Sequence, residues 1–183
     1  MNVIAGGYDL MFIQNKNLLI REAEVKDAEI LCMWWNDGKV MAHAGFPNGL
    51  GISLEKLQKQ LTVPDSIVNR LIIEADNRAI GEMSYSNTGD GGAEIGIKIC
   101  DESQQEKGYG RIFLSMLIKE LFRTGYKKIL LDTNLNNTRA QHIYEKLGFS
   151  KVRVNKDAWR DQLGSLQTSV DYELTQTTFI DFT

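Results

Sequence analysis

The stretch from residue 93 to residue 133 constrains the fold most, because it alternates two strand patterns with one long helix pattern. Ala93–Cys100 has apolar side chains at every second position, which is typical of a β-strand. Gly108–Thr124 carries rows of apolar side chains four residues apart, which predicts an amphipathic helix. Lys127–Thr133 is short and almost wholly apolar, which favours a central strand covered on both faces. The stretch therefore predicts an α/β protein.

The flanking regions carry the same two periodicities. They predict strands over 17–22, 67–75, 79–86, 150–156 and 168–175, and helices over 26–36, 54–63 and 137–147. Asp27 and Ser53 are the expected N-caps of the first two helices, and Pro64–Asp65 is expected to end the second. Residues 37–51 are rich in glycine and interrupted by Pro47, which predicts a long loop of the kind that often binds ligands.

Length and charge limit the organisation and the partners of the chain. A chain of 183 residues fits one domain, so we expect residues 1–16 to be an N-terminal extension and residues 17–183 a single domain. The net charge of −3 argues against nucleic-acid or membrane partners and weakly favours a cationic substrate. There is no long apolar run and no signal-peptide pattern, so we expect a cytoplasmic protein. Cys32 and Cys100 are expected to be buried free thiols, and no metal site is expected.

The segment Gln105–Gly110 (QEKGYG) lies between a predicted strand and a predicted helix. The first N–H groups of a helix have no partner within the helix and attract anions. Gly108 and Gly110 let the backbone approach a phosphate closely, and Lys107 and Arg111 add positive charge. Taken alone, the two glycines fit tight packing of loop against helix equally well.

A second pattern lies on the helix predicted over 137–147. Asn137 is expected to cap it and to offer its amide to a ligand. Ala140 and Tyr144 are four residues apart and share a face, so the small alanine leaves room beside the phenol ring. Gly148 is expected to end the helix, and Phe149 to return to the core.

In this order, the two patterns resemble the GNAT superfamily of acetyl-CoA-dependent N-acetyltransferases, and the resemblance extends over residues 18–174. The segment LIRE at Leu19–Glu22, Asp27 and the segment WWND at Trp34–Asp37 resemble the branch that includes ribosomal-protein-alanine N-acetyltransferases. The resemblance implies a GNAT-like mixed, mostly antiparallel central sheet of about six to seven strands flanked by about four helices. The strand before the phosphate loop is expected to splay from its neighbour.

The resemblance implies acetyl-CoA as co-substrate, with its pantetheine arm bonded to the backbone of the strand at 93–100 and its pyrophosphate on the loop amides. The residues expected to contact acetyl-CoA are Ile97, Ile99, Gln105, Glu106, Lys107, Gly108, Tyr109, Gly110, Arg111, Asn137 and Tyr144. The implied reaction is direct attack of a neutral amine on the thioester in a ternary complex. A cysteine mechanism through Cys100 would require a lowered thiol pKa.

Catalytic groups follow from the same resemblance. Tyr144 is expected to be the general acid, because a phenol is a suitable proton donor to a thiolate. Glu94 is the first candidate base, although a strand glutamate that faces solvent or forms a salt bridge fits equally well, and Glu82 is the second candidate. The residues expected to bind the acceptor are Trp35, Asp37, His43 and Phe46.

The sequence leaves three further questions open. The acceptor is either a small-molecule amine or a protein N-terminus. The chain is either an enzyme or a non-catalytic acyl-CoA-binding or sensor module on the same fold. A third hypothesis is a protein that binds the phosphates of a nucleotide. The sequence disfavours it, because Arg111 follows Gly110 where a magnesium-binding Ser or Thr would be expected. Edge pairing of the C-terminal hairpin would allow a homodimer.

Overall fold

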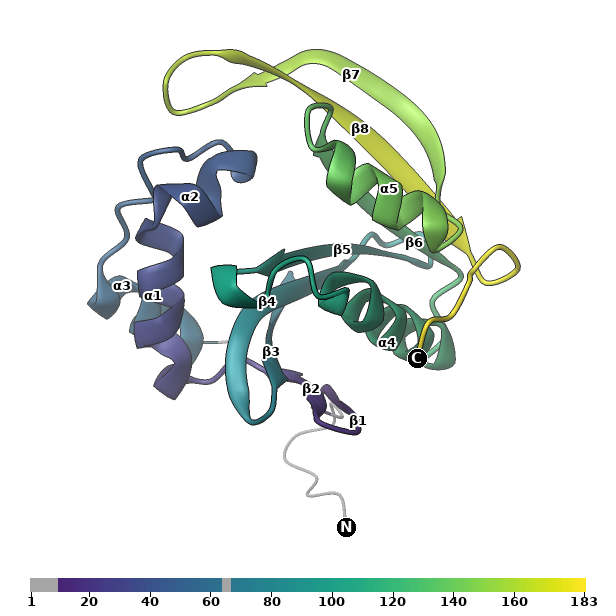
Figure 1. Ribbon diagram of the computed structural model, residues 1–183, viewed down its shortest axis with the longest axis horizontal. Coiled ribbons are helices and arrows are strands. Elements are labelled where there is room, and N and C mark those ends of the chain that lie inside the picture. Colours follow the sequence, from purple (N-terminus) through teal and green to yellow (C-terminus); the bar gives the residue numbers. More distant parts are fainter. Residues whose placement is uncertain (1–9, 64–66) are drawn as a thin grey trace.

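The structure is a computed structural model that describes residues 10–63 and 67–183. The predicted helix end at Pro64–Asp65 and the first part of the predicted N-terminal extension lie outside the described residues. One twisted sheet runs through the molecule, and helices cover both of its faces (Figure 1).

The sheet has eight strands in the order β1-β2-β3-β4-β5-β6-β8-β7. The strands are β1 Phe12–Asn15, β2 Leu18–Glu22, β3 Val68–Ala75, β4 Arg78–Asn87, β5 Gly92–Ile99, β6 Lys128–Asn134, β7 Ser150–Arg160 and β8 Leu166–Thr175. Every neighbouring pair is antiparallel except β5 and β6, which are parallel and are connected through a long helix. The predicted mixed, mostly antiparallel sheet is confirmed.

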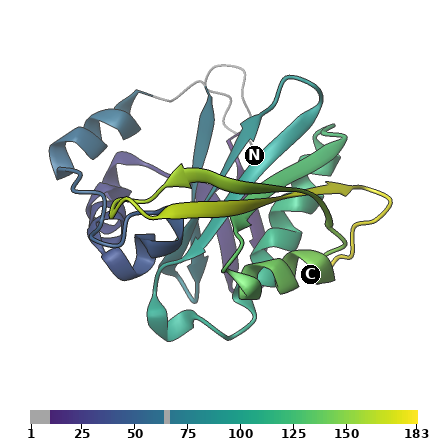
Figure 2. The same cartoon turned by 90° about the horizontal axis from the view of Figure 1, so that it is seen from above.

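Within residues 10–63 and 67–183, five α-helices accompany the sheet. They are α1 Ala28–Asn36, α2 Gly38–Met41, α3 Leu54–Thr62, α4 Tyr109–Arg123 and α5 Thr138–Lys146. The alternation of β3 shows how the two faces are filled: Leu71 and Ile73 belong to the core that contains α4 and α5 residues, whereas Ile72 belongs to the core that contains α1 and α3 residues. Figure 2 shows the β7–β8 hairpin running across the top of the molecule toward the α1–α2 side.

Two ends of the sheet differ from the sequence-based expectation. Phe12–Asn15 pairs with β2, so part of the predicted N-terminal extension is an edge strand of the sheet. The C-terminal hairpin is longer than expected, because β7 continues to Arg160 and only a short turn precedes Leu166. The side chains of β7 are mostly exposed along its length, so the strand lacks the alternation by which a half-buried strand is identified. Dimerisation through this edge stays a prediction.

The capping predictions have mixed outcomes. Ser53 caps α3 as predicted, since its Oγ accepts a hydrogen bond from the Lys56 N–H. Asp27 is at the N-cap position of α1 as predicted, but its side chain makes no cap hydrogen bond to that helix. Its carboxylate accepts the Glu24 N–H at 2.8 Å and pairs with both terminal nitrogens of Arg21 at 2.7 and 2.8 Å. The predicted position of Asp27 is therefore confirmed, whereas its oxygens bond to Arg21 and to the Glu24 N–H and not to the first turn of α1.

The segment predicted as one loop over residues 37–51 contains short helical structure. Asp37 accepts the Lys39 N–H at 2.7 Å and begins α2, and a 3-10 turn over Ala42–Ala44 follows. Gly45, with φ of 92°, ends this turn in the left-handed region that glycine adopts at low cost. The segment therefore has a defined shape above the sheet.

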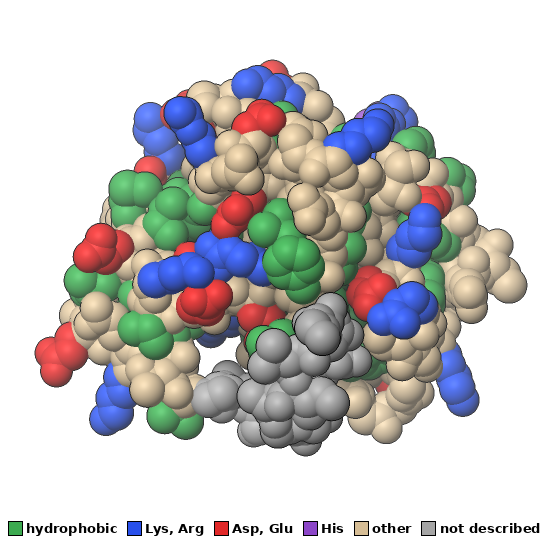
Figure 3. All heavy atoms as spheres, turned by 90° about the horizontal axis from the view of Figure 1, so that it is seen from below, with side chains coloured by type: hydrophobic (Ala, Val, Ile, Leu, Met, Phe, Trp, Pro, Cys, Tyr) green, Lys and Arg blue, Asp and Glu red, His purple; other side chains and the backbone are tan. Residues whose placement is uncertain are grey.

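The C-terminal segment after β8 packs against α4. The Phe182 N–H donates to the buried Ser115 Oγ at 3.1 Å, and Asp181 forms an ion pair with Lys119 at 2.8 Å. Figure 3 shows acidic and basic side chains interspersed on the face seen from below, so neither sign of charge dominates that face. No helix among the described residues is long and apolar enough to span a membrane.

Candidate active site

The parallel strands β5 and β6 diverge, and this divergence opens the site. Their pairing is limited to Gly92–Glu94 against Lys128–Leu130. Beyond this point β5 pairs only with β4, and β6 pairs only with β8. The splay expected of the strand before the phosphate loop is confirmed, and it leaves backbone N–H and C=O groups of β5 available to an extended ligand.

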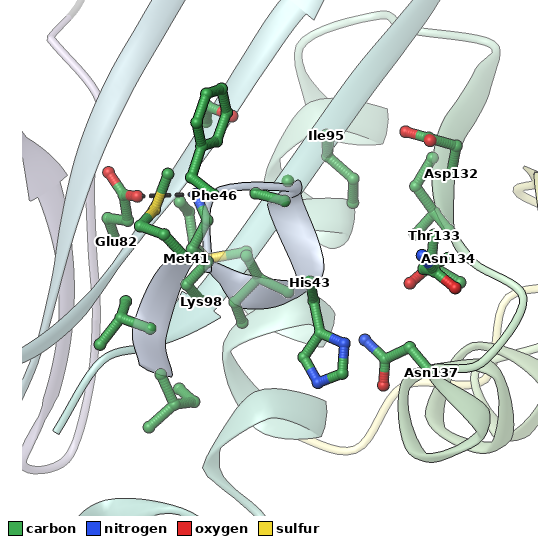
Figure 4. A pocket seen from close by; sticks show the side chains of 18 of the residues that line it. Met41, His43, Phe46, Glu82, Ile95, Lys98, Asp132, Thr133, Asn134 and Asn137 are labelled. Atoms are coloured by element: carbon green, nitrogen blue, oxygen red, sulfur yellow. Dashed lines mark hydrogen bonds and ion pairs between the residues drawn. The ribbon is translucent and has the colours of Figure 1, made fainter. Parts of the chain in front are cut away.

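A cleft with a volume of about 770 Å³ occupies this opening. Its floor comes from β3, β4 and β5, one wall from α1 and the segment after it, and the other wall from β6 and α5. Trp159 of β7 completes the lining. Figure 4 shows His43 and Asn137 pointing toward one another across the cleft from the two walls. Elements from the whole chain therefore meet at one cavity.

The loop Gln105–Gly110 leads from the end of β5 to α4, as predicted. The Gln105 side chain donates to the Ile99 carbonyl at 3.0 Å and fixes the loop to the strand. Gly108 has φ of 83° at the N-cap of α4, and the first helical backbone hydrogen bond runs from the Ile112 N–H to its carbonyl. The N–H groups of Glu106 through Arg111 therefore precede the hydrogen-bonded part of the helix and form an anion-binding arrangement.

The two loop glycines face open space. A Cβ atom built on either Gly108 or Gly110 would meet no heavy atom within 4 Å. Glycine at these positions is not required by packing within the protein, and the alternative interpretation of tight loop–helix packing loses its support. A group outside the protein, such as a phosphate, can approach the backbone here.

The charged side chains around the loop are placed differently from the expectation. The Arg111 guanidinium lies 4.2 Å from the Phe182 ring centroid, and its buried Nε has no hydrogen-bond partner among the described residues. Lys107 bonds to Gln104 at 3.1 Å, and Glu106 pairs with Arg139 of α5 at 3.1 Å. Lys107 is exposed, so it can turn toward a phosphate, whereas Arg111 is held against the C-terminal segment.

The helix α5 brings its predicted residues to the second wall. Asn137 caps the helix by accepting the Ala140 N–H at 3.2 Å, and it also lines the cleft. Gly148, with φ of 95°, follows the helix, and Phe149 is buried. The predicted cap, the helix end at Gly148 and the buried position of Phe149 are confirmed.

Tyr144 lies at the inner end of the cleft. Tyr144 is 7% exposed, and its ring packs edge-on against Tyr172, with centroids 5.6 Å apart, and tilted against Phe149 at 5.9 Å. Its hydroxyl has no hydrogen bond to any described residue, and the side chain lines the cleft. Burial, with the nearby Asp132 and Tyr172, raises the pKa of Tyr144 well above its ordinary value. The phenol is therefore protonated at physiological pH.

Of the two candidate bases, only Glu82 lines the cleft. One of its oxygens accepts hydrogen bonds from the Trp35 indole and from Lys98, both at 2.9 Å. Figure 4 shows Glu82 and Lys98 on the same side of the cleft. Glu94 is exposed and lies beside Leu130, where β5 and β6 are still paired. It is four residues before Lys98, which corresponds to about 13 Å along the strand. The structure therefore does not bring Glu94 to the cleft.

Three of the four predicted acceptor residues line the cleft, namely Trp35, His43 and Phe46. Asp37 does not, because its carboxylate caps α2. Trp159 also lines the cleft, although it lies between the strands predicted over 150–156 and 168–175 and was not among the predicted site residues. The indole packs so closely on Gly45 that a Cβ there would collide with the ring.

The tip of the β7–β8 hairpin is tied to the segment after α2. The Gln162 N–H donates to the Gly45 carbonyl at 2.8 Å, and its side chain bonds to the Asn48 N–H at 2.9 Å and the Gly49 carbonyl at 3.0 Å. These bonds hold Trp159 against Gly45, on the wall of the cleft that α1 and the segment after it form.

The cysteines are both free, with Cys100 buried and Cys32 half-buried. Burial, with a smaller contribution from Glu82, raises the pKa of the Cys100 thiol to about 12. Cys100 is not part of the cleft lining. Both observations oppose the alternative in which Cys100 carries the acetyl group. Within residues 10–63 and 67–183, no group of His, Cys, Asp and Glu side chains is arranged to hold a metal ion.

Comparison with known proteins shows which family and which relatives resemble this chain. An acetyltransferase (GNAT) domain model matches residues 17–150. An uncharacterized protein of Methanocaldococcus jannaschii is 25% identical over 147 residues, which cover 79% of this chain and 30% of that protein. The ribosomal protein bS18-alanine N-acetyltransferase of Haemophilus ducreyi is 30% identical over 70 residues, which cover 38% of this chain and 48% of that protein. The chain thus spans less than half the length of these curated relatives.

Solved structures share the fold. Spermidine N-acetyltransferase from Vibrio cholerae, in complex with CoA and spermine, has a TM-score of 0.80 and 22% identity, and the match covers 90% of this chain and 98% of that one. The ribosomal L7/L12 α-N-protein acetyltransferase RimL, in complex with coenzyme A, has a TM-score of 0.80 and 18% identity over the same shares. Because the matching domain model spans most of the sequence, the chain belongs to the GNAT acetyltransferase family.

Proposed function

We propose that the protein transfers the acetyl group of acetyl-CoA to a primary amine by direct attack in a ternary complex. The observation that supports this proposal is that three features meet at one cleft. The open edge of β5 matches the pantetheine arm of an acyl-CoA thioester, and the free N–H groups before α4 match its pyrophosphate. The phenol of Tyr144 matches the sulfur that leaves.

The residues present fit acetyl-CoA. The backbone of Ile97 and Ile99 lies where β5 has no β6 partner, and it would bond the pantetheine arm. The N–H groups from Glu106 to Arg111 would hold the pyrophosphate, with Lys107 close by, whereas the Gln105 N–H already donates to the Glu102 carbonyl. Asn137 would contact the arm from the second wall. Bound acetyl-CoA supplies the acetyl group in activated thioester form.

Two side chains of the cleft have complementary roles in the proposed proton transfers. Glu82 would accept the proton that the amine nitrogen loses as the N–C bond forms, either directly or through a water molecule. Tyr144 would donate its proton to the sulfur as the C–S bond breaks, and it would be reprotonated from solvent. Its raised pKa keeps the donor protonated before the reaction. No acyl-enzyme is required.

Acetyl-CoA binding is the first test. Thermal unfolding should be measured with and without acetyl-CoA, with ATP and NAD as controls. A ligand at ~100 times its dissociation constant adds about 2.7 kcal/mol, so we expect the midpoint to rise by roughly 5–10 °C with acetyl-CoA alone. A shift with ATP only would favour a nucleotide binder and would refute the proposal.

The two glutamates provide a matched pair for the catalytic role. Glu82→Gln is expected to lower kcat by about 10²-fold, whereas Glu94→Gln should leave kcat within about a factor of two. Equal effects of the two substitutions would remove Glu82 as the base. Acetyl-CoA binding without any acetyl transfer, across peptide and small-molecule amines, would instead identify the non-catalytic binding module.

A further inference from the structure

The charged side chains of the cleft are separated into two regions. Asp132 of β6 is on the wall that also carries Tyr144. Arg70 of β3 and Lys39 of α2 are on the opposite, acceptor side. Figure 4 shows Glu82 and Asp132 at opposite sides of the cavity. The net charge of the acceptor side therefore depends on four side chains, namely Glu82, Lys98, Arg70 and Lys39.

Glu82 adds little net negative charge to that side. Lys98 lies 2.9 Å from its carboxylate, and the side chain of Glu82 is only 8% exposed. At the distance of a bound ligand, the negative charge of Glu82 and the positive charge of Lys98 nearly cancel. The remaining charges on the acceptor side are those of Arg70 and Lys39, and they are both positive.

Arg70 is held in place without being neutralised. Its guanidinium stacks 4.7 Å from the centroid of the Trp35 ring, and that ring is itself fixed by the bond to Glu82. Among residues 10–63 and 67–183, no carboxylate lies within ion-pair distance of Arg70 or of Lys39. A planar guanidinium that is positioned by stacking and faces a cavity can bind a carboxylate through two parallel hydrogen bonds.

The separation of the charged regions sets the spacing of the ligand groups. Arg70 on β3 is two strands away from β5, and adjacent strands are about 5 Å apart, so the two strands are about 10 Å apart. The reacting amine must lie beside β5, where the acetyl group is proposed to sit. An extended peptide advances by about 3.5 Å per residue, so an acidic side chain at position two or three of a peptide matches this spacing.

We propose that the acceptor is a primary amine that also carries a carboxylate, with the carboxylate bound by Arg70 and Lys39 on the acceptor side of the cleft. This inference rests on the proposed acetyl transfer and selects among its amine substrates. The spacing favours a peptide N-terminus with an acidic second or third residue. A polyamine places a second positive charge beside Arg70 and is disfavoured by repulsion.

The experiment compares acceptors of equal size and different charge. C-terminally amidated tetrapeptides with aspartate, asparagine or lysine at position two or three are assayed for kcat/KM, beside free glutamate and spermidine. We expect the aspartate peptides to exceed the asparagine peptides by at least about tenfold, and spermidine to be the poorest acceptor. Glutamate as the best acceptor would identify a small amino acid as the source of the carboxylate.

Variants of Arg70 isolate the cause. Arg70→Gln should lower kcat/KM for the aspartate peptide by roughly 10–100-fold and change that for the asparagine peptide by less than about threefold. Arg70→Lys keeps the charge but loses the stacking on Trp35 and the paired hydrogen bonds, so it should retain only part of the preference. Arg78→Gln removes an exposed arginine outside the cleft and is the matched control.

Two outcomes overturn the proposal: a preference for spermidine or for the lysine peptides, and an equal loss for all acceptors in Arg70→Gln. Calorimetric binding of the same peptides to the protein, with and without CoA, gives the ranking independently of turnover. If the protein lacks acetyl transfer but binds the aspartate peptides preferentially, the proposed function fails and the charge selectivity stands. A flat binding ranking contradicts the selectivity whatever the turnover.

Discussion

Replacing Tyr144 by phenylalanine removes one hydroxyl and little else. The ring packs on Tyr172 and Phe149, and a phenylalanine ring can keep both contacts. The hydroxyl has no hydrogen bond to any described residue, so no described group loses a partner. We therefore expect the free energy of unfolding to change by less than about 1 kcal/mol.

The catalytic effect should be much larger than the effect on stability. General acid catalysis contributes about 10²–10⁴-fold to a rate, so kcat should fall by at least about 10²-fold, or ~2.7 kcal/mol of barrier. The affinity for acetyl-CoA should stay within about a factor of three, because the lost group acts on the departing sulfur. Steady-state CoA release gives kcat, and calorimetry gives the affinity.

Tyr172→Phe is the matched control. Tyr172 packs on the same ring, but its hydroxyl lies 3.3 Å from Glu145 and outside the cleft. Its kcat should remain near that of the unmodified protein. A Tyr144→Phe protein with normal kcat would refute the assignment of the acid.

The pH dependence offers a second check on Tyr144. Its folded-state pKa is raised above the ordinary 10.0, so the phenol keeps its proton at every pH below that value. Deprotonation of Tyr144 should therefore cause no loss of kcat below pH ~10. A high-pH decline below this range that disappears in Tyr144→Phe would contradict the account.

Three further substitutions test the cofactor loop, the hairpin contact and the buried ion pair. Gly110→Val, with open space at its Cβ, should weaken acetyl-CoA binding at least about tenfold by calorimetry while the melting temperature stays within a few degrees. Gly45→Ala would press on the Trp159 ring and should raise the acceptor KM several-fold in steady-state kinetics without changing acetyl-CoA affinity. Asp27→Asn should cost about 3 kcal/mol of unfolding free energy at pH 7. Burial would raise the pKa of Asp27, but hydrogen bonds, chiefly from Arg21, lower it, so denaturation experiments should show this difference shrinking as pH falls below about 4.

The sequence predicted those helices and strands whose formation depends on the local spacing of apolar side chains. Strands β2 to β6 and helices α4 and α5 each bury one face or both, so their apolar spacing is visible in the sequence. The strand β1 has only four residues and no fully buried side chain, and α2 has only four residues. Elements this short present too little periodicity to be identified.

The candidate site likewise contains residues that local spacing predicts and residues whose position depends on the tertiary fold. The loop at Gln105–Gly110 and the helix carrying Asn137 and Tyr144 act through backbone geometry and fixed offsets, which sequence spacing describes. Glu82 and Glu94 are both strand glutamates, and the difference between them arises from where β5 leaves β6 and where Trp35 packs. No local pattern carries that information.

The distribution of charge in the cleft is the property that the sequence predicts least well. The net charge of −3 weakly favours a cationic substrate, whereas the acceptor side of the cleft carries unpaired Arg70 and Lys39. These two residues come from β3 and α2, which the tertiary fold brings to one cavity. Overall composition averages over such regions, so it cannot describe the field that a bound ligand experiences.

The central claim is direct acetyl transfer within one cleft that holds both substrates. Its most direct test is a two-substrate initial-rate study, with acetyl-CoA and an aspartate-containing peptide varied together and the acetylated peptide identified by mass spectrometry. The account predicts intersecting double-reciprocal lines, as a ternary complex requires. Parallel lines with a trapped acetyl-protein would show a covalent intermediate and contradict the account.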